Sequence, residues 1–381
     1  MPPRSRRCTR RSPSRRSRKR RRALRRPHRV PRGRRSSASG STCSGRPRVK
    51  GSSMARVHIL ATGGTIAGTA GSPVDLGYHS AGLGVSALVD GVQGLRSVAT
   101  LTGEQFSQVG SQDMDDDLWL KLAARVNALF SADEADGIVI THGTDTAEET
   151  GFFLHLVVKY ERPVVLTGSM RPATALSPDG PLNLFNAVSV AADPQARGRG
   201  AIVAINDDLH SARDVTKSST TDVQTFVSPG PGLLGTASYG RIRYFRYPTH
   251  PHTTDSEFSV NGEIVLPRVD IVYAHANMPA DLVRASAALG ARGLVVAGVG
   301  NGNVSTEVAQ ALAEIAGSGV IVVRSSRVGS GDVGRNIEMD DDQLGLVASD
   351  QLNPQKSRVL LQLCLARGLQ RDAVQDAFYR Y

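Results

Sequence analysis

Short apolar runs alternate with amphipathic stretches along the chain after Met54. Four of these runs have the length and content of buried strands: 57–61, 137–141, 163–167 and 201–205. The stretch 147–160 has its apolar residues at helical spacing. This alternation predicts an α/β fold in which a mostly parallel sheet carries helices on both faces.

The same pattern resumes after residue 267. We expect strands and helices over 271–276, 280–289, 293–298, 307–316, 320–324, 354–367 and 372–379. They predict a smaller, flavodoxin-like α/β domain at the C-terminal end. The intervening segment 246–267, which contains YPTHPH (247–252), is typical of a linker. We therefore expect a larger domain at 54–245 and a smaller one at 268–381.

Charge is distributed unevenly along the chain. Its 381 residues include 46 Lys and Arg and 35 Asp and Glu, a net charge of +11. The first 50 residues hold 21 of the basic side chains and no acidic one, so residues 54–381 carry a net charge of −10. This excludes a basic nucleic-acid-binding domain for 54–381. Residues 1–53 are expected to be disordered and fit a nucleic-acid arm or a targeting segment, and Met54 is an alternative start.

Cysteine content and the length of the apolar runs exclude further classes of protein. Cys364 is the single cysteine outside the basic segment, which excludes a disulfide framework and a cysteine–histidine zinc site. No run approaches the roughly 18 apolar residues of a membrane span, and no secretory signal core follows the charges. We therefore expect a cytoplasmic protein without a membrane partner, with export by an unrecognised route as the alternative.

Polar turns follow the four strands predicted in the first part of the chain. They are TGGTIAG (62–68), HGTDT (142–146), GSMRP (168–172) and the run 206–208. Open α/β sheets bind ligands at the carboxyl ends of their strands. These turns are therefore where chemistry is expected.

Each candidate residue also has a structural interpretation. TGGT lacks the GK[ST] ending of a phosphate-binding loop, and Thr65 alone could be an ordinary turn residue. Thr144 and Asp145 could serve the start of a helix in which Thr146 and Glu149 have capping-box spacing. Turn or surface roles would equally account for the other candidates, Ser111, Gln112 and Lys217.

The motifs taken together resemble one family. They are TGGTIAG (62–68), GSQDM (110–114), THGTDTAEET (141–150), TGSMRP (167–172), DGPLNLFNA (179–187), RDVTK (213–217), TTDVQTF (220–226), GVGNGN (298–303), RSSRV (324–328) and LNPQKSRVLLQL (352–363). In this order they are similar to the bacterial L-asparaginases, most closely to the high-affinity, often exported type II branch. The resemblance covers essentially all of 54–381, and TGGTIAG and HGTDT are its most specific segments.

The resemblance implies hydrolysis of asparagine to aspartate and ammonia without a metal or an organic cofactor. It implies that Thr65 is the nucleophile and forms an acyl-enzyme. Tyr78 matches a tyrosine on a glycine-rich lid (71–84) that closes over the site. Glu338 matches the acidic residue that a neighbouring subunit or the second domain brings to that tyrosine.

A second catalytic set is implied as well. Lys217, paired with Asp145, would hold Thr144 ready to activate the water that deacylates the enzyme. The reverse order, in which Thr144 attacks first, stays open.

Substrate contacts follow from the same resemblance. Ser111 and Gln112 match the binders of the substrate carboxylate and ammonium, and Asp145 also pairs with the ammonium. Backbone amides around Gly64 and Gly143 are implied as donors to the oxyanion. Ser169 would line the amide pocket, at a position where the family more often has Ala. Asn303 of a partner subunit would contact the substrate ammonium. Because the smaller domain carries Asn303 and Glu338, we expect a homo-oligomer, usually in this family a tetramer of two intimate dimers.

Two other functions stay open at this stage. One is a glutaminase-asparaginase that accepts L-glutamine as well as L-asparagine. The other is a nucleic-acid-binding protein that acts through the Arg-rich segment, with a vestigial enzyme body. A tRNA-linked amidase is disfavoured because the 328 residues of 54–381 leave no room for the extra domain.

Overall fold

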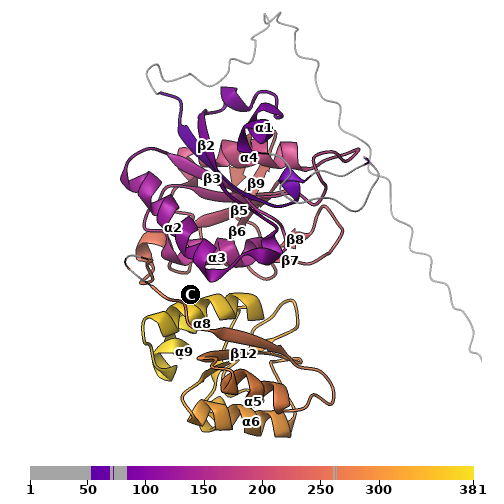
Figure 1. Ribbon diagram of the computed structural model, residues 1–381, viewed down its shortest axis with the longest axis vertical. Helices are drawn as coiled ribbons and strands as arrows, with labels where there is room; N and C mark the ends of the chain where they lie inside the picture. Colours follow the sequence, from indigo (N-terminus) through magenta and orange to yellow (C-terminus); the bar gives the residue numbers. More distant parts are fainter. Residues whose placement is uncertain (1–52, 69–71, 73–83, 261, 263) are drawn as a thin grey trace, which may run out of the picture. The chain divides into compact units, whose positions relative to one another are not determined.

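The computed structural model describes residues 53–68, 72, 84–260, 262 and 264–381, and its residues 53–381 form one compact unit. Tyr78 and most of the predicted lid lie outside the described residues, as do residues 1–52. The unit contains an eight-stranded sheet and a smaller four-stranded one (Figure 1). The α/β fold class predicted from the sequence is confirmed.

The larger sheet has five parallel neighbours, in the order β5-β4-β3-β1-β2. Their bounds are β1 Arg56–Gly63, β2 Thr100–Val109, β3 Gly137–Thr141, β4 Val164–Thr167 and β5 Ala201–Ile205. Val57 pairs with Gly137, and Arg56 pairs with Thr100, so β1 lies between β3 and β2. Central strands are buried on both faces, which explains their uninterrupted apolar runs.

Alternate residues of the central strands face two separate cores. Leu60 and Ile140 pack with α2 (Asp116–Ser131) and α3 (Ala147–Val157). Their chain neighbours Ile59 and Val139 pack instead with α1 (Val85–Asp90) and α4 (Gly180–Ala191). The period-two alternation of a strand thus places helices on both faces of the sheet.

An antiparallel extension continues the larger sheet beyond β5. It consists of β6 Asp208–Ser211, β9 Gly235–Ser238 and β10 Arg241–Tyr244. A separate two-stranded ribbon pairs β7 (Thr216–Lys217) with β8 (Phe226–Val227). These short strands carry mixed polar and apolar residues, so the apolar pattern of the sequence did not predict them.

The smaller sheet is parallel, with the order β11-β12-β13-β14. Its strands are β11 Val269–Tyr273, β12 Gly293–Gly298, β13 Ile321–Ser326 and β14 Val347–Ala348. The helices of this part are α5 Asp281–Ala288, α6 Thr306–Gly317, α7 Asp341–Leu344, α8 Pro354–Ala366 and α9 Arg371–Arg380. Helices α5 and α6 cover one face of the sheet, whereas α8 and α9 cover the other.

One apolar core joins the two sheets through α8. Val359 and Leu360 of α8 belong to the same buried cluster as Phe152 of α3 and Val295 of β12. Phe258, from the segment predicted to be a linker, is buried in that cluster against Tyr381. No helix within the described part of the chain is long and apolar enough to span a membrane.

Candidate active site

The loops after four neighbouring parallel strands carry most of the residues predicted for the site. Thr65 follows β1, Ser111 follows β2, Thr144 follows β3 and Ser169 follows β4. Because these strands are parallel neighbours, their carboxyl ends meet at one edge of the sheet. The fourth predicted turn, 206–208, follows the next parallel strand, β5, and forms the hairpin between β5 and β6; it carries none of the predicted site residues.

The loop after β1 packs directly on the loop after β3. Gly64 has φ of 82°, and a methyl group there would overlap the Cα and N atoms of Gly143. A Cβ atom on Gly143 would in turn lie 2.5 Å from Ser111 Oγ. Thr65 begins a short 3₁₀ turn beside this contact and is buried, with 5% of its surface exposed. The two glycines thus allow three loops to meet in van der Waals contact.

Lys217 brings the predicted second set together. Its ammonium donates to Thr144 Oγ1 at 2.9 Å and to Asp145 Oδ1 at 2.6 Å. Thr144 is buried, whereas the Asp145 side chain is more than half exposed. These bonds place a buried hydroxyl, an amine and a solvent-facing carboxylate in one connected group.

Ser111 is tied to the start of α3. Its hydroxyl oxygen accepts from the Asp145 amide at 3.3 Å, and its carbonyl accepts from the Thr146 hydroxyl at 2.7 Å. The predicted capping box is therefore wrong, because the Thr146 hydroxyl is turned towards Ser111 and makes no cap in the described structure. The Thr146 side chain instead joins the Ser111 loop to the Thr144–Asp145 loop.

Two further predicted contacts lie beside this group. Gln112 is exposed, and its amide donates to Asp113 Oδ2 at 3.2 Å. Ser169 is buried, and its hydroxyl donates to the Arg171 carbonyl at 2.8 Å. The Ser169 hydroxyl is thus engaged within its own turn, whereas the Gln112 side chain is open to solvent.

Asn303 and Glu338 lie together on the smaller sheet's loops. The Asn303 amide donates to Glu338 Oε2. The buried Arg324 binds the carboxylate of Asp341 through two hydrogen bonds of 2.7 Å and also donates to the Gly334 carbonyl at 2.9 Å. None of the hydrogen bonds described for Ser111, Thr144 or Lys217 involves Asn303 or Glu338. In the described structure this pair is thus bonded within itself.

A buried polar chain that the sequence analysis did not identify supports the Gly143 loop. Trp119 Nε1 donates to Thr150 Oγ1 at 2.9 Å, and Thr150 Oγ1 lies 3.0 Å from His142 Nε2. His142 Nδ1 lies 2.7 Å from the Gly143 carbonyl, which assigns the ring proton to Nδ1 and makes Nε2 the acceptor. Burial lowers the pKa of His142, so the neutral ring fits this chain.

Glu149 lies in the first turn of α3, near these loops. It lines a pocket of about 490 Å³ with Trp119 and Arg358. Burial raises the pKa of Glu149 to about 7, Arg358 opposes this shift and Glu148 adds to it. The carboxyl group therefore changes charge near neutral pH.

The chain matches two family models. Residues 56–250 match "Asparaginase, N-terminal", and residues 268–378 match "Glutaminase/Asparaginase C-terminal domain". The chain belongs to the asparaginase family. The resemblance recognised in the sequence is thereby confirmed, and with it the class of amidohydrolases.

Named relatives agree with this assignment. The chain is 50% identical over 322 residues to "Probable L-asparaginase periplasmic" of Haemophilus influenzae, a match that covers 84% of this chain and 92% of the relative. It is 44% identical over 330 residues to "Glutaminase-asparaginase" of Pseudomonas fluorescens biotype A, covering 86% and 91%. The crystal structure of "Probable Cytoplasmic L-asparaginase from Campylobacter jejuni" superposes with a TM-score of 0.83 at 40% identity, covering 86% of this chain and 100% of that one.

The cytoplasmic location expected from the sequence is wrong. The relative at 50% identity is named as periplasmic. The expectation depended on the residues before the folded unit, where no apolar signal core was found, and that segment lies outside the described residues. The absence of a recognisable signal therefore carries no information on the compartment.

Proposed function

We propose that this asparaginase-family protein hydrolyses the side-chain amide of L-asparagine to give L-aspartate and ammonia. The observation that carries the proposal is the Lys217 ammonium, which donates to both Thr144 and Asp145 beside the buried Thr65 turn. Amide hydrolysis requires a nucleophile, a group that moves its proton and donors for the oxyanion. We assign these roles to Thr65, to Lys217 with Thr144, and to backbone amides around Gly64 and Gly143.

In the first step, Thr65 Oγ forms a bond to the amide carbon, and the C–N bond breaks to release ammonia, which takes up the hydroxyl proton. Tyr78 from the lid and Glu338 from a partner subunit assist this proton transfer. Backbone amides around Gly64 and Gly143 stabilise the oxyanion. The close packing of these two glycines supports this, since it brings the two backbones together beside Thr65.

In the second step, water attacks the acyl carbon, the bond to Thr65 Oγ breaks, and the proton that the water loses is returned to Thr65 Oγ. Thr144 orients that water, and Lys217 exchanges a proton with the Thr144 hydroxyl over 2.9 Å. The exposed carboxylate of Asp145 holds Lys217 and pairs with the substrate ammonium. Ser111 and Gln112 bind the α-carboxylate and ammonium, and Ser169 lines the amide pocket.

The active protein is a homo-oligomer, usually in this family a tetramer of two intimate dimers. Asn303 and Glu338 support this proposal because they are bonded to each other, and Glu338 is exposed. A side chain presented in this way is available to a neighbouring copy. The partner's pair would complete the ammonium end of each site.

A second candidate substrate is L-glutamine. A relative with 44% identity is named a glutaminase-asparaginase, which favours mixed amide specificity as the alternative. The relatives named above are named as an L-asparaginase and a glutaminase-asparaginase, so neither name supports a nucleic-acid-binding function. We expect no metal or organic cofactor to take part.

The test is ammonia release by the full chain from L-asparagine and from L-glutamine. We expect release from L-asparagine that requires both Thr65 and Lys217. A chain that is folded but releases ammonia from neither amide would contradict the proposal.

A further inference from the structure

The N-terminal end of α8 carries a polar group that bridges the two sheets. Asn353 caps the helix, since its Oδ1 accepts from the Lys356 amide at 3.0 Å. Its Nδ2 donates to Glu148 Oε2 at 3.0 Å and lies 3.5 Å from Thr216 Oγ1. Gln355 donates to the other Glu148 oxygen at 2.8 Å. Both oxygens of the buried carboxylate are thus bound by one turn of α8.

Lys356 lies at the centre of this group. Its ammonium donates to the Val215 carbonyl and lies 3.6 Å from Glu148 Oε2. Only 2% of the residue is exposed, and burial lowers its pKa while Glu148 opposes that shift. Removing one partner of a buried ion pair is costly, so this amine is strongly held in place.

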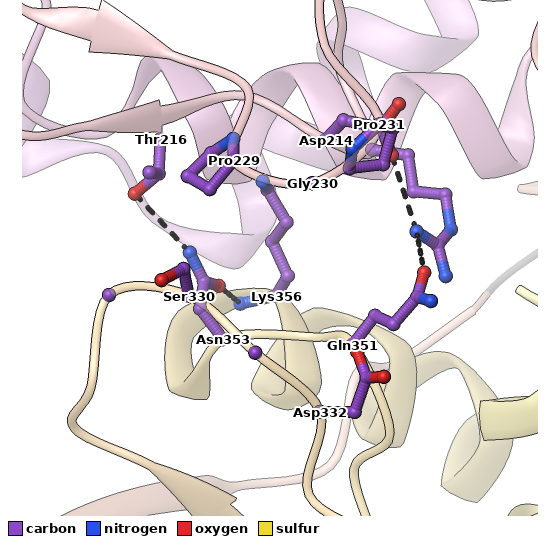
Figure 2. Close-up of a pocket in the computed structure, with 13 residues that line it drawn as sticks. Asp214, Thr216, Pro229, Gly230, Pro231, Ser330, Asp332, Gln351, Asn353 and Lys356 are labelled. Atoms are coloured by element: carbon purple, nitrogen blue, oxygen red, sulfur yellow. Dashed lines mark hydrogen bonds and ion pairs between the residues drawn. The ribbon is translucent and has the colours of Figure 1, made fainter. Parts of the chain in front are cut away.

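The two partners of Lys356 are close in sequence to the two halves of the proposed second catalytic set. Val215 precedes Lys217 by two residues, and Glu148 follows Asp145 by three. Figure 2 shows Lys356 extending from α8 towards the loops of the larger sheet, with Thr216 and Asn353 joined beside it. These residues line a pocket of about 440 Å³. A single side chain therefore links both segments.

Lys217 lies on a ribbon that offers little local support. Its strand, β7, has two residues, and it pairs with another two-residue strand, β8. Such a short pair is only marginally stable without tertiary contacts. The position of Lys217 relative to Thr144 therefore depends on tertiary contacts with other segments of the chain.

We infer that Lys356 is a positioning residue for this asparaginase. It binds Val215 and Glu148 and so fixes the spacing of Lys217 from Thr144 and Asp145, on which deacylation depends. The inference rests on the proposed function of that set. It assigns Lys356 no contact with the substrate.

The test uses the double substitution Lys356→Met with Glu148→Gln in the full chain. It removes both charges together, so that no buried charge is left unpaired. The amide oxygen of the new Gln at 148 can still accept from Asn353. Its NH₂ group can donate to the oxygen of the Gln355 amide once that amide has rotated. Rapid-quench measurements of ammonia released from L-asparagine give the amplitude and rate of the first turnover and the steady-state rate.

We expect the first turnover to keep its rate, while the steady-state rate per active site falls by about tenfold to a hundredfold, since misplacement by about 1 Å costs that much. KM should fall in parallel with kcat, so that kcat/KM, which reports acylation, stays at the parental value. A purely structural role would lower the burst amplitude and leave the steady-state rate per active site at the parental value. That result would overturn the inference.

Three further variants make the outcome specific. Glu148→Gln alone keeps the shape of the site and removes only the charge that pairs with Lys356, so it should lower the steady-state rate in the same direction, by less, if the double variant does not fold. Lys121→Met removes an exposed lysine of α2 and should leave both rates unchanged.

Lys217→Met tests the proposed function itself. If Lys217→Met slows deacylation and the Lys356 double variant does not, only the positioning role of Lys356 fails. If Lys217→Met has no effect, the proposed second set fails.

Discussion

Gly64 packs so closely on Gly143 that a methyl group at Gly64 would overlap the backbone of its neighbour. This contact joins the loop of Thr65 to the loop of Thr144, although the two glycines are 79 positions apart in the sequence. It therefore sets the distance between the two threonines that the proposed reaction uses.

Gly64→Ala should lower kcat for L-asparagine by at least about tenfold, because the two loops must move apart. Gly94→Ala is the matched control. Gly94 has the same φ of 82°, and no heavy atom of the described structure lies within 4 Å of an added Cβ. It should cost about 1 kcal/mol of stability and leave kcat unchanged. Equal kcat in the two variants would contradict the role of the contact.

Thr65→Ala should lower kcat by at least about three orders of magnitude, the scale seen when a covalent catalytic group loses its nucleophile. The fold should be retained, because a turn threonine contributes little to the core. Ammonia release measures the activity, and the unfolding midpoint serves as the control. Activity within roughly tenfold of the parent would remove Thr65 from the role of nucleophile.

Mixed oligomers test whether Glu338 acts across subunits. Chains with Thr65→Ala and chains with Glu338→Gln should each be nearly inactive alone. Co-expressed, they should recover up to about a quarter of the parental activity, because half the dimers are mixed and each has one intact site of two. Co-expression is needed because a tight interface does not exchange freely. Mixed dimers as inactive as the parents would place the complete site within one chain.

The raised pKa of Glu149 predicts that the free energy of unfolding depends on pH. Its pKa is raised to about 7 in the folded protein from an ordinary value of 4.5. The folded state therefore binds this proton more tightly than the unfolded state, and the associated stability is present below pH 4.5 and lost as pH rises through 7. Glu149→Gln should accordingly be more stable than the parent at pH 8, by on the order of 3 kcal/mol, and nearly equal to it at pH 4. Urea unfolding at both pH values measures this. A difference that does not change with pH would contradict it.

The sequence predicted the parts of the site that local pattern determines. β1 and β3 are central strands with uninterrupted apolar runs, so the sequence shows where each strand ends, at TGGT and at HGTDT. β2 is an edge strand with mixed burial, TLTGEQFSQV, and it lacks such a run. Its position beside β1, which places Ser111 at the site, could therefore not be predicted from periodicity.

Other features depend on contacts between distant residues. The spacing of Thr146 and Glu149 fits a capping box, yet the Thr146 hydroxyl donates to the Ser111 carbonyl and its oxygen caps no amide of the helix. Glu148 and Lys356 are separated by more than 200 positions, so only the folded chain shows that they pair. Sequence alone gives no sign that Glu149 is only partly exposed, because charged residues in the first turn of a helix are usually solvated.

The bond from Lys356 to Val215 also has a consequence for synthesis on the ribosome. The segments with Thr65, Ser111, Thr144 and Lys217 emerge well before α8, which is more than 130 residues later than Lys217. At ordinary translation rates this interval is on the order of ten seconds. During this interval the nascent chain contains the proposed reacting residues of the larger sheet but not α8, the helix whose Lys356 binds Val215. Activity should therefore begin only after α8 has been made and has docked.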